Sequence, residues 1–250
     1  MPTNRPFVLT VAGLDPSGGA GILADCKTFE QHQVLGLAVV TANTIQTENK
    51  FIQMQWIDLD FVLESITALF KNYPIAVVKI GIVPSLLFLD AVVSTIKKVA
   101  PTTKIVWDPV LKSSSKYNFL TLEDRSELNS ILTKIDLITP NYDEILQLFP
   151  SFISDKLWLK NELPTTILLK GGHNCAALGT DYLFVKNNII ELPPNDAEHQ
   201  PKHGSGCVLS SAIAANLALG KNMKDACIDA KLYIENYLSS TSSLIGYHYV

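Results

Sequence analysis

Short apolar runs rich in β-branched residues recur along the chain and alternate with stretches in which apolar residues repeat at helical spacing. A run that is apolar throughout is typical of a strand buried on both faces, as in a parallel sheet covered by helices. The pattern therefore predicts an α/β fold with a mostly parallel central sheet. The predicted strands are Phe7–Ala12, Leu37–Thr41, Ala76–Ile80, Lys104–Trp107, Leu137–Ile138 and Thr166–Leu169.

Helical periodicity between and after these runs predicts the crossover helices and a final helix. Two apolar segments separated by an Asn-Asn pair predict a late hairpin over Leu183–Pro194, with Asn187 and Asn188 at its turn. The predicted helices are Gly21–Gln31, Phe61–Lys71, Leu86–Val99, Leu122–Leu132, Asp143–Leu148, Gly206–Leu219 and Lys224–Leu238.

Polar or turn-forming clusters follow four of the predicted strands. They are Asp15–Gly21, Asp108–Lys116, Asn141–Glu144 and Gly171–His173. In open α/β sheets, ligands bind beyond the carboxyl ends of the strands. We therefore expect these clusters to converge on one crevice.

Composition narrows the class of protein. Hydrophobic residues make up 47% of the 250 residues and charged residues 18%, which supports a large core, and we expect residues 1–250 to form a single domain. The formal charge of −4 gives no general attraction to nucleic acid or to an anionic membrane. Any bound phosphate therefore needs a local pocket.

Cysteine spacing and segment length exclude further classes. The four cysteines form no C-x-x-C pair, which removes the usual zinc and dithiol signatures. Residues 75–96 are interrupted by Lys79, Gly81, Pro84 and Asp90, whereas a membrane-spanning helix needs about 20 largely uninterrupted apolar residues. We expect a cytoplasmic protein without a membrane span.

The segment HGSGCVLSSAIAANLALG, residues 203–220, predicts a glycine loop that opens directly into a helix. Free backbone N–H groups and the positive dipole end at a helix N-terminus make an anion site, here over Gly204, Ser205 and Gly206. Such a place lowers the pKa of a thiol, so Cys207 could act as a base toward a substrate hydroxyl. The alternative is that Cys207 is a small core residue beside an ordinary turn.

Charged and amide side chains at other strand ends suit a phosphate and its metal ion. Lys170, before two glycines, can place an ammonium beside phosphate oxygens. Asp108, Asn141 and Glu144 offer the oxygen ligands that Mg²⁺ takes together with substrate phosphates. The alternatives are a solvated lysine, and an N-cap Asn141 with Glu144 as its capping-box partner.

Two segments suggest a site for a flat ring. The sequence VLTVAGLDPSGGAG, residues 8–21, places three glycines within four residues, Gly18, Gly19 and Gly21, after a predicted buried strand, where they permit close approach of a ligand. Gln46, after the second strand, offers a donor and an acceptor to a heterocycle edge, although a surface glutamine explains it as well. The chain has neither G-x-x-x-x-G-K-[ST] nor G-x-G-x-x-G nor H-E-x-x-H, so a bound ATP needs another phosphate cradle.

Five of these segments, in order along the whole chain, resemble motifs of the hydroxymethylpyrimidine/phosphomethylpyrimidine kinases of thiamine biosynthesis, within the ribokinase-like superfamily. AGLDPSGGAGILADCKTF is similar to the N-terminal signature of that family, and VWDPV to its D-P-V segment. TPNYDE resembles its Asn-x-x-Glu magnesium motif, LLKGGH its K-G-G-H strand end, and HGSGC its H-G-T-G-C anion hole.

The resemblance implies a three-layer α/β/α sandwich and an ATP- and Mg²⁺-dependent kinase. Its substrate would be 4-amino-5-hydroxymethyl-2-methylpyrimidine and then the monophosphate, and a homodimer is expected. Gly13, Asp15, Ala20, Gln46 and Ile82 match positions on the pyrimidine side, with Ile82 where these kinases commonly carry Met. Asp108, Asn141, Glu144 and Lys170 match the nucleotide, metal and phosphate side, whereas Gly204, Ser205, Gly206 and Cys207 match the anion hole with its base.

Two other functions fit the same residues. A pyridoxal or pyridoxine kinase would bind a substituted pyridine that also bears a hydroxymethyl arm, although Gln46 and the small Ala20 favour the pyrimidine. A non-catalytic pyrimidine-binding sensor would bind without turnover, although Lys170, Glu144 and Cys207 speak against it.

Overall fold

The computed structural model describes residues 4–112, 117–152 except 121–126, residue 154, and residues 163–172, 178–185 and 188–249. Nine strands of this part form one sheet, in the order β3-β2-β1-β4-β5-β6-β7-β8-β9. The six strands from β2 to β7 in that order are parallel to one another. β3 pairs antiparallel with β2, β8 with β7, and β9 with β8. The strands are β1 Phe7–Leu14, β2 Leu35–Gln46, β3 Phe51–Trp56, β4 Ile75–Ile80, β5 Lys104–Trp107, β6 Leu137–Ile138, β7 Thr166–Leu169, β8 Asp181–Val185 and β9 Asn188–Leu192.

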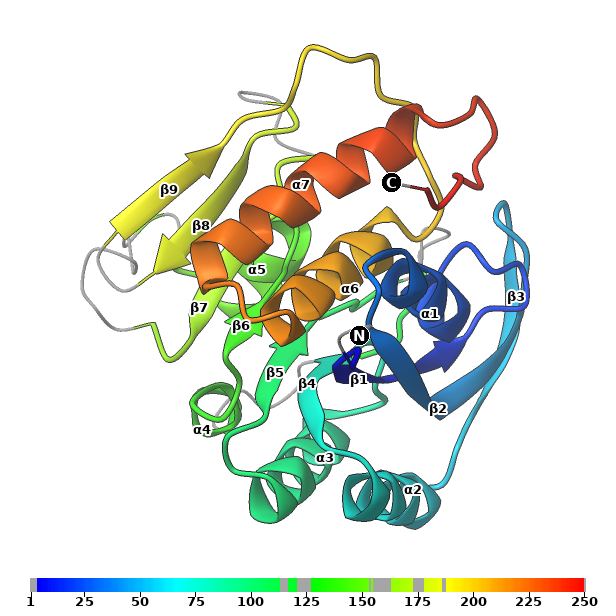
Figure 1. The fold of residues 1–250 in the computed structure, drawn as a ribbon, viewed down its shortest axis with the longest axis vertical. Coiled ribbons are helices and arrows are strands. Elements are labelled where there is room, and N and C mark those ends of the chain that lie inside the picture. The colour runs from blue at the N-terminus through cyan, green and yellow to red at the C-terminus, as the bar shows by residue number, and fades with distance from the viewer. Residues whose placement is uncertain are drawn as a thin grey trace.

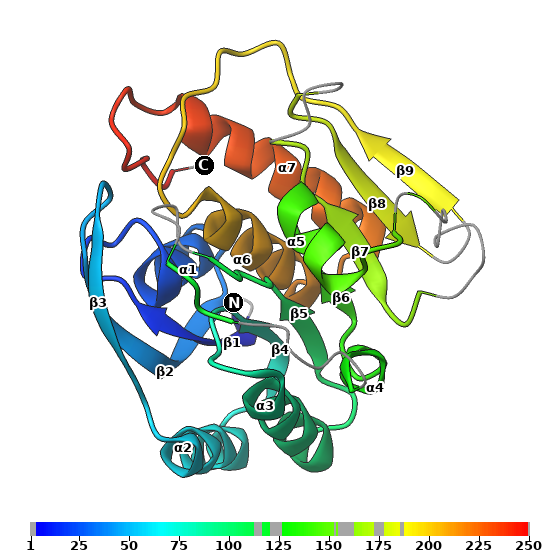
Figure 2. The ribbon, with the colours of Figure 1, turned by 180° about the vertical axis from the view of Figure 1, so that it is seen from behind.

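Helices cover both faces of this sheet, as Figures 1 and 2 show from opposite sides. The helices are α1 Gly21–Gln31, α2 Leu59–Asn72, α3 Leu86–Val99, α4 Leu128–Leu132, α5 Tyr142–Leu148, α6 Ser205–Ala218 and α7 Met223–Ser239. One buried cluster joins the sheet to α2, α3, α4 and α5, and a second joins its other face to α1, α6 and α7. The predicted α/β fold with helices on both faces is confirmed.

Neighbouring residues of the buried strands point to opposite clusters. In β1, Val8 packs on the α1/α6/α7 side and Leu9 on the α2/α3 side, and in β4 Val77 and Val78 divide in the same way. The apolar runs of the sequence follow from this arrangement, because a strand covered on both faces has no solvent side.

The structure adds one strand to those expected and lengthens another. β3 was not predicted, because none of its residues is buried at the sheet edge and its two glutamines interrupt any continuous apolar run. β2 extends to Gln46 rather than ending at Thr41, so Gln46 lies in the strand and not after it. Residues 122–126 of a predicted helix lie outside the described part, and α4 is the remainder.

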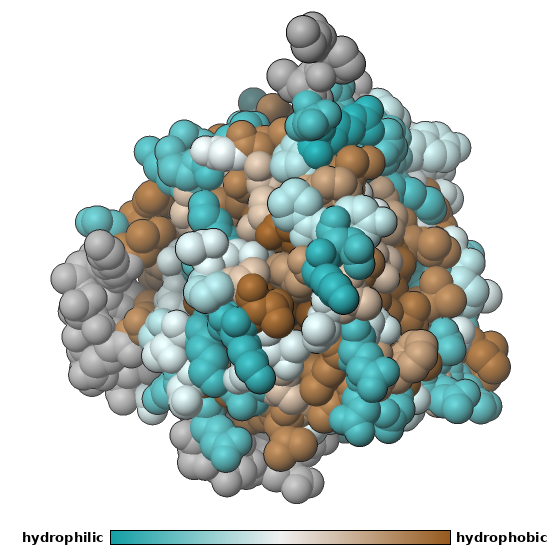
Figure 3. Space-filling model, turned by 60° about the horizontal axis from the view of Figure 1, so that its bottom comes forward, coloured by the Kyte–Doolittle hydropathy of each residue, from teal (hydrophilic) through white to brown (hydrophobic). Residues whose placement is uncertain are grey.

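The hairpin of β8 and β9 is confirmed, although it begins at Asp181 and the turn residues 186–187 are not among those described. In the described residues, no helix has both the length and the apolar composition that a membrane crossing requires. Figure 3 shows hydrophilic side chains interspersed with apolar ones on the face turned up from the lower end of Figure 1, where α2 and α3 lie.

Candidate active site

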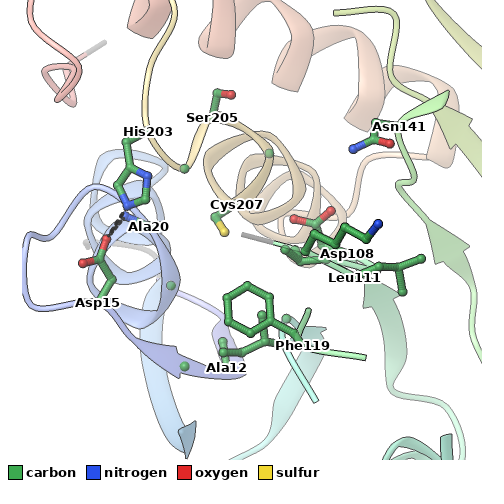
Figure 4. A pocket seen from close by; sticks show the side chains of 18 of the residues that line it. Ala12, Asp15, Ala20, Asp108, Leu111, Phe119, Asn141, His203, Ser205 and Cys207 are labelled. Carbon is green, nitrogen blue, oxygen red and sulfur yellow. Dashed lines mark hydrogen bonds and ion pairs between the residues drawn. The ribbon is translucent and has the colours of Figure 1, made fainter. Parts of the chain in front are cut away.

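A cavity of about 590 Å³ lies at the carboxyl ends of the central strands. All of the site residues predicted from the sequence contribute to its lining, and Figure 4 shows several of them directed toward it. They are Gly13, Asp15, Ala20, Gln46, Ile82, Asp108, Asn141, Glu144, Lys170, Gly204, Ser205, Gly206 and Cys207. The expected convergence of the strand-end clusters is therefore present.

Asp15 organises the glycine-rich loop between β1 and α1. Its buried carboxylate accepts hydrogen bonds from the Ser17 and Ala20 backbone N–H groups and from the Ser17 hydroxyl. His203 Nε2 also lies 2.8 Å from Asp15 Oδ2, as the dashed line in Figure 4 marks. Burial alone would raise the pKa of Asp15, but the contacts with His203 and Ser17 hold this pKa below its usual value.

Close backbone approach explains the glycine at the start of α1. Gly21 has a φ of 56°, and a Cβ there would lie 2.2 Å from the carbonyl oxygen of Gly13. A Cβ on Gly13 would in turn lie 2.5 Å from Ile82 Cδ1. The loop is thus folded tightly back on β1, and Ile82 directly faces the glycine on the cavity wall.

The second glycine loop opens α6 at the cavity. Gly204, the N-cap, has a φ of 71°, and a Cβ on it would lie 2.1 Å from the carbonyl oxygen of Gly19. Among the residues that the structure describes, no side chain caps the N-terminus of α6. The N–H groups of its first turn and its positive dipole end therefore face the cavity, which is an anion-binding arrangement.

Cys207 lies in this first turn, and its sulfur is directed into the cavity in Figure 4. The predicted lowering of its pKa is wrong. Burial raises the pKa of the Cys207 thiol to about 11, because withdrawal from water outweighs the nearby Lys79 ammonium and the Gly21 N–H that favour the thiolate. In the unliganded site the residue is a neutral thiol at pH 7.

Lys170 lies at the end of β7 in an acidic setting. Its Nζ is 2.9 Å from Asp108 Oδ1 and 3.8 Å from Glu144 Oε2. Burial would favour the neutral amine, but these carboxylates raise the pKa of Lys170 and keep it charged. A Cβ on Gly206 would lie 3.2 Å from this Nζ, so the ammonium adjoins the anion site of α6. His173, of the same motif, is outside the described residues.

Asn141 and Glu144 form the capping box that was one of the two interpretations of their spacing. The Asn141 side chain accepts from the Glu144 N–H at 2.9 Å, and Glu144 Oε2 accepts from the Asn141 N–H at 2.8 Å. Burial raises the pKa of Glu144 to about 7, although Lys170 opposes this shift. Both residues nevertheless line the cavity, so capping and a role in the site are compatible.

The structure adds cavity residues that the sequence analysis did not single out. Lys79, Phe119, Leu111 and His203 contribute to the cavity lining, and Lys79 forms a fully buried ion pair with Asp25 there. His203 belongs to the H-G-S-G-C segment, so its position next to the anion loop in the sequence could have identified it as a cavity residue. A charged residue within an apolar strand was the available signal for Lys79.

The fold and the cavity together define a small-molecule kinase of the ribokinase-like class. The chain resembles the crystal structure of an ADP complex of Bacillus subtilis pyridoxal kinase, with a TM-score of 0.79 and 26% identity over 94% of this chain and 92% of that one. It also resembles the crystal structure of phosphomethylpyrimidine kinase from Clostridium difficile, with a TM-score of 0.76 and 32% identity over 92% of this chain and 98% of that one.

Sequence comparison narrows this class to one family. The phosphomethylpyrimidine kinase model matches residues 15–249. The hydroxymethylpyrimidine/phosphomethylpyrimidine kinase of Aquifex aeolicus is 35% identical over 246 residues, which cover 95% of this chain and 96% of that protein. The chain belongs to the phosphomethylpyrimidine kinase family. The resemblance, the fold class and the assignment as a kinase that were predicted from the sequence are confirmed.

Proposed function

We propose that the protein, acting as one kinase domain, phosphorylates the hydroxymethyl group of 4-amino-5-hydroxymethyl-2-methylpyrimidine with ATP and then phosphorylates the monophosphate, in thiamine biosynthesis in the cytoplasm. Family membership supports the substrate class. The observation that carries the proposal is that one cavity has a glycine-walled side suited to a flat ring and, facing it, an anion site with a lysine. Transfer of a phosphoryl group from a nucleotide to a ring alcohol needs both a ring-binding side and a phosphate-binding side in one cavity.

On the ring side, Gln46 supplies an amide that can donate to and accept from a pyrimidine edge. Gly13 and Ala20 keep the wall low enough for a ring to lie flat, and Ile82 adds apolar contact. The Asp15 carboxylate is engaged by its own loop and by His203, so its role is to hold the shape of this wall rather than to receive a proton.

On the anion side, Lys170 and the N–H groups at Gly204, Ser205 and Gly206 bind the transferred phosphoryl group. Phosphoryl transfer is catalysed mostly by positioning and by stabilising charge on the phosphate oxygens. Asp108 keeps the Lys170 ammonium charged and beside the N-terminus of α6. In-line attack by the hydroxymethyl oxygen then proceeds with this charge already in place.

The oxygen atoms near Lys170 that could act as metal ligands fit a magnesium ion. The Glu144 carboxylate accepts from the backbone N–H groups of Asn141 and Leu111, and its remaining lone pairs are available. Mg²⁺ is bound through one or two carboxylates together with waters and substrate phosphates. Glu144, beside Asn141, would hold the ion, which would neutralise charge on the nucleotide phosphates.

Cys207 is the proposed base for the substrate hydroxyl. Its sulfur lies between the ring side and the anion side, next to the place where the substrate hydroxyl oxygen would lie. Because the thiol is neutral at pH 7 in the free protein, the active fraction of Cys207 is small there and grows with pH.

The test is product analysis after incubation of the purified protein with Mg-ATP and hydroxymethylpyrimidine. We expect the monophosphate first and the pyrophosphate later, with matching ADP release. The Lys170→Met variant is expected to lose most of this turnover, whereas Lys134→Met, outside the cavity lining, should keep it. A wild-type protein that binds the pyrimidine but releases no ADP would instead be a non-catalytic sensor.

Pyridoxal phosphorylation is the second candidate. The structural likeness to a pyridoxal kinase favours it, and Ile82, where the pyrimidine kinases commonly have Met, is neutral between the two rings. Equal concentrations of pyridoxal and hydroxymethylpyrimidine in one ATP-consuming reaction separate the two candidates. We expect the pyrimidine phosphate to dominate the products, and pyridoxal phosphate as the main product would reverse the assignment.

A further inference from the structure

A fully buried ion pair, whose lysine contributes to the cavity lining, has no part in the mechanism derived so far. Lys79 Nζ lies 3.0 and 2.8 Å from the two carboxylate oxygens of Asp25, and neither side chain is exposed. Thr10 and Ser211 donate further hydrogen bonds to Asp25, each at 2.6 Å. Burying two charges is costly, and well-packed apolar residues often stabilise a fold equally well. Stability alone therefore does not explain the pair.

The position of Lys79 in β4 explains why its ammonium is buried in the core. Side chains of β4 alternate between the two faces of the sheet, and Val77 packs on the side of α1 and α6. Lys79, two residues later, points to the same side and pairs in register with Thr10 of β1. The ammonium is thus held between the sheet and the second turns of α1 and α6.

α1 and α6 contact each other at two levels along their lengths. The backbone N–H of Gly21, at the start of α1, hydrogen-bonds to Cys207 in α6. Four residues further along each helix, Asp25 accepts the hydrogen bond from Ser211. Four residues are about one helical turn, a rise of about 6 Å. The ion pair therefore lies about one turn beneath the Cys207 thiol.

We propose that Lys79 is a positioning residue for Cys207: its ammonium, fixed by Asp25, supplies the positive charge that stabilises the Cys207 thiolate. This inference rests on the proposed function, in which that thiolate takes the proton of the substrate hydroxymethyl group. As the proton moves to sulfur, the new O–P bond forms and the bond from the γ-phosphorus to the bridging oxygen breaks. ADP leaves with that electron pair.

The charges around the thiol support this role for Lys79. Burial is the largest influence on Cys207 and raises its pKa, and Asp25 from α1 and Asp108 from the end of β5 act in the same direction. Lys79 from β4 opposes them and acts more strongly than either carboxylate, and the Lys170 ammonium after β7 also interacts with Cys207. Removing Lys79 alone would leave Asp25 uncompensated, whereas removing both charges would take away a smaller net stabilisation of the thiolate.

The experiment measures how fast iodoacetamide alkylates Cys207 at pH 8, followed by mass spectrometry of the peptide that contains it. We expect Lys79→Met to slow this alkylation about tenfold, which corresponds to one pKa unit, and Lys79→Met/Asp25→Asn to slow it about threefold. The matched control is Lys134→Met, which removes the lysine of the half-exposed pair with Asp90 and should leave the rate unchanged.

Stability and the alkylation rate are expected to separate in the double variant, where the rate falls but the stability does not. Lys79→Met leaves a buried carboxylate without its partner and should unfold more easily, whereas the double variant removes both charges and should be about as stable as the wild type. If Lys79→Met does not fold, the double variant decides. A folded double variant with the alkylation rate of the wild type overturns the role of Lys79.

Kinetics provide the second measurement. In the double variant we expect kcat to fall by the same factor as the alkylation rate, with the KM for ATP unchanged. Alkylation needs no substrate, so the inference is tested even if hydroxymethylpyrimidine is not phosphorylated. Wild-type turnover of the pyrimidine together with equal alkylation rates in all variants would reject the role of Lys79 and leave the proposed function intact.

Discussion

His203 Nε2 lies 2.8 Å from Asp15 Oδ2, across 188 residues of sequence. This contact joins the loop after β1, on the ring side of the cavity, to the loop that opens α6 on its anion side. Backbone packing of Gly204 against Gly19 reinforces the junction. The two halves of the proposed site are therefore fixed relative to each other before any ligand binds.

Asp15→Asn is expected to weaken this junction. The folded-state pKa of Asp15 is held below its usual value by His203 and Ser17 against the effect of burial. The ionised carboxylate thus contributes stability that is fully present above the unfolded-state pKa of about 3.9 and is lost as the pH falls through the folded-state pKa.

At pH 7 we expect the free energy of unfolding of Asp15→Asn to be lower than that of the wild type by about 2 kcal/mol, as for a buried charged hydrogen bond. Urea titrations at pH 7 and pH 3 measure the gap, which should be smaller at pH 3, below the unfolded-state pKa. The control is Asp196→Asn, at an exposed position. A gap that widens on acidification would contradict the role assigned to Asp15.

Cys207→Ala is expected to lower kcat by about a hundredfold, the usual range for loss of a general base, with little change in the KM for ATP. Because the pKa of Cys207 is about 11, its thiolate fraction should rise about tenfold per pH unit between pH 7 and 9. The kcat of the wild type should follow that rise.

Two variants check the assignment of Cys207. Cys207→Asp should retain part of the activity and lose the steep pH dependence, because a carboxylate is already ionised in that range. Cys26→Ala, which changes a half-buried cysteine outside the cavity lining, is the control and should behave as the wild type. A kcat of the wild type that is flat from pH 7 to 9 would remove the thiolate from the mechanism.

Glu144→Gln is expected to raise the Mg²⁺ concentration that gives half-maximal activity by about tenfold, since a neutral amide is a weaker ligand for a hard cation. The amide keeps an oxygen that can accept from the Asn141 N–H, so helix α5 should stay capped. Magnesium titrations at saturating ATP measure the effect. Glu64→Gln, on the exposed face of α2, is the control, and an equal shift in both variants would argue against Glu144 as a ligand.

Gly204→Ala is expected to disrupt the anion site, because a Cβ there would lie 2.1 Å from the Gly19 carbonyl oxygen. Gly220 is the matched control: its φ of 89° is also positive, but a Cβ on it meets nothing within 4 Å. Gly220→Ala should cost only the backbone strain of about 1–2 kcal/mol. Urea unfolding and the KM for ATP distinguish the two, and a Gly204→Ala variant with normal KM would show that the close contact is dispensable.

The sequence by itself determined the layers of the fold and most of the cavity lining. Runs such as Phe7–Leu14 have apolar residues for both faces of the sheet, and the capping box of Asn141 and Glu144 is encoded within four residues. Because parallel strands end at one edge of the sheet, polar clusters after separate strands had to meet there. These features depend on local pattern and on a general rule of α/β topology.

Tertiary structure alone decided how the residues of the cavity are charged and paired. The pKa of Cys207 depends on its burial and on Lys79, Asp25 and Asp108 from three other segments, so the helix N-terminus by itself predicted the wrong direction. The partners of Lys79 and His203 lie 54 and 188 residues away. Solvation and Coulomb interactions depend on distance in space, which no spacing along the chain expresses.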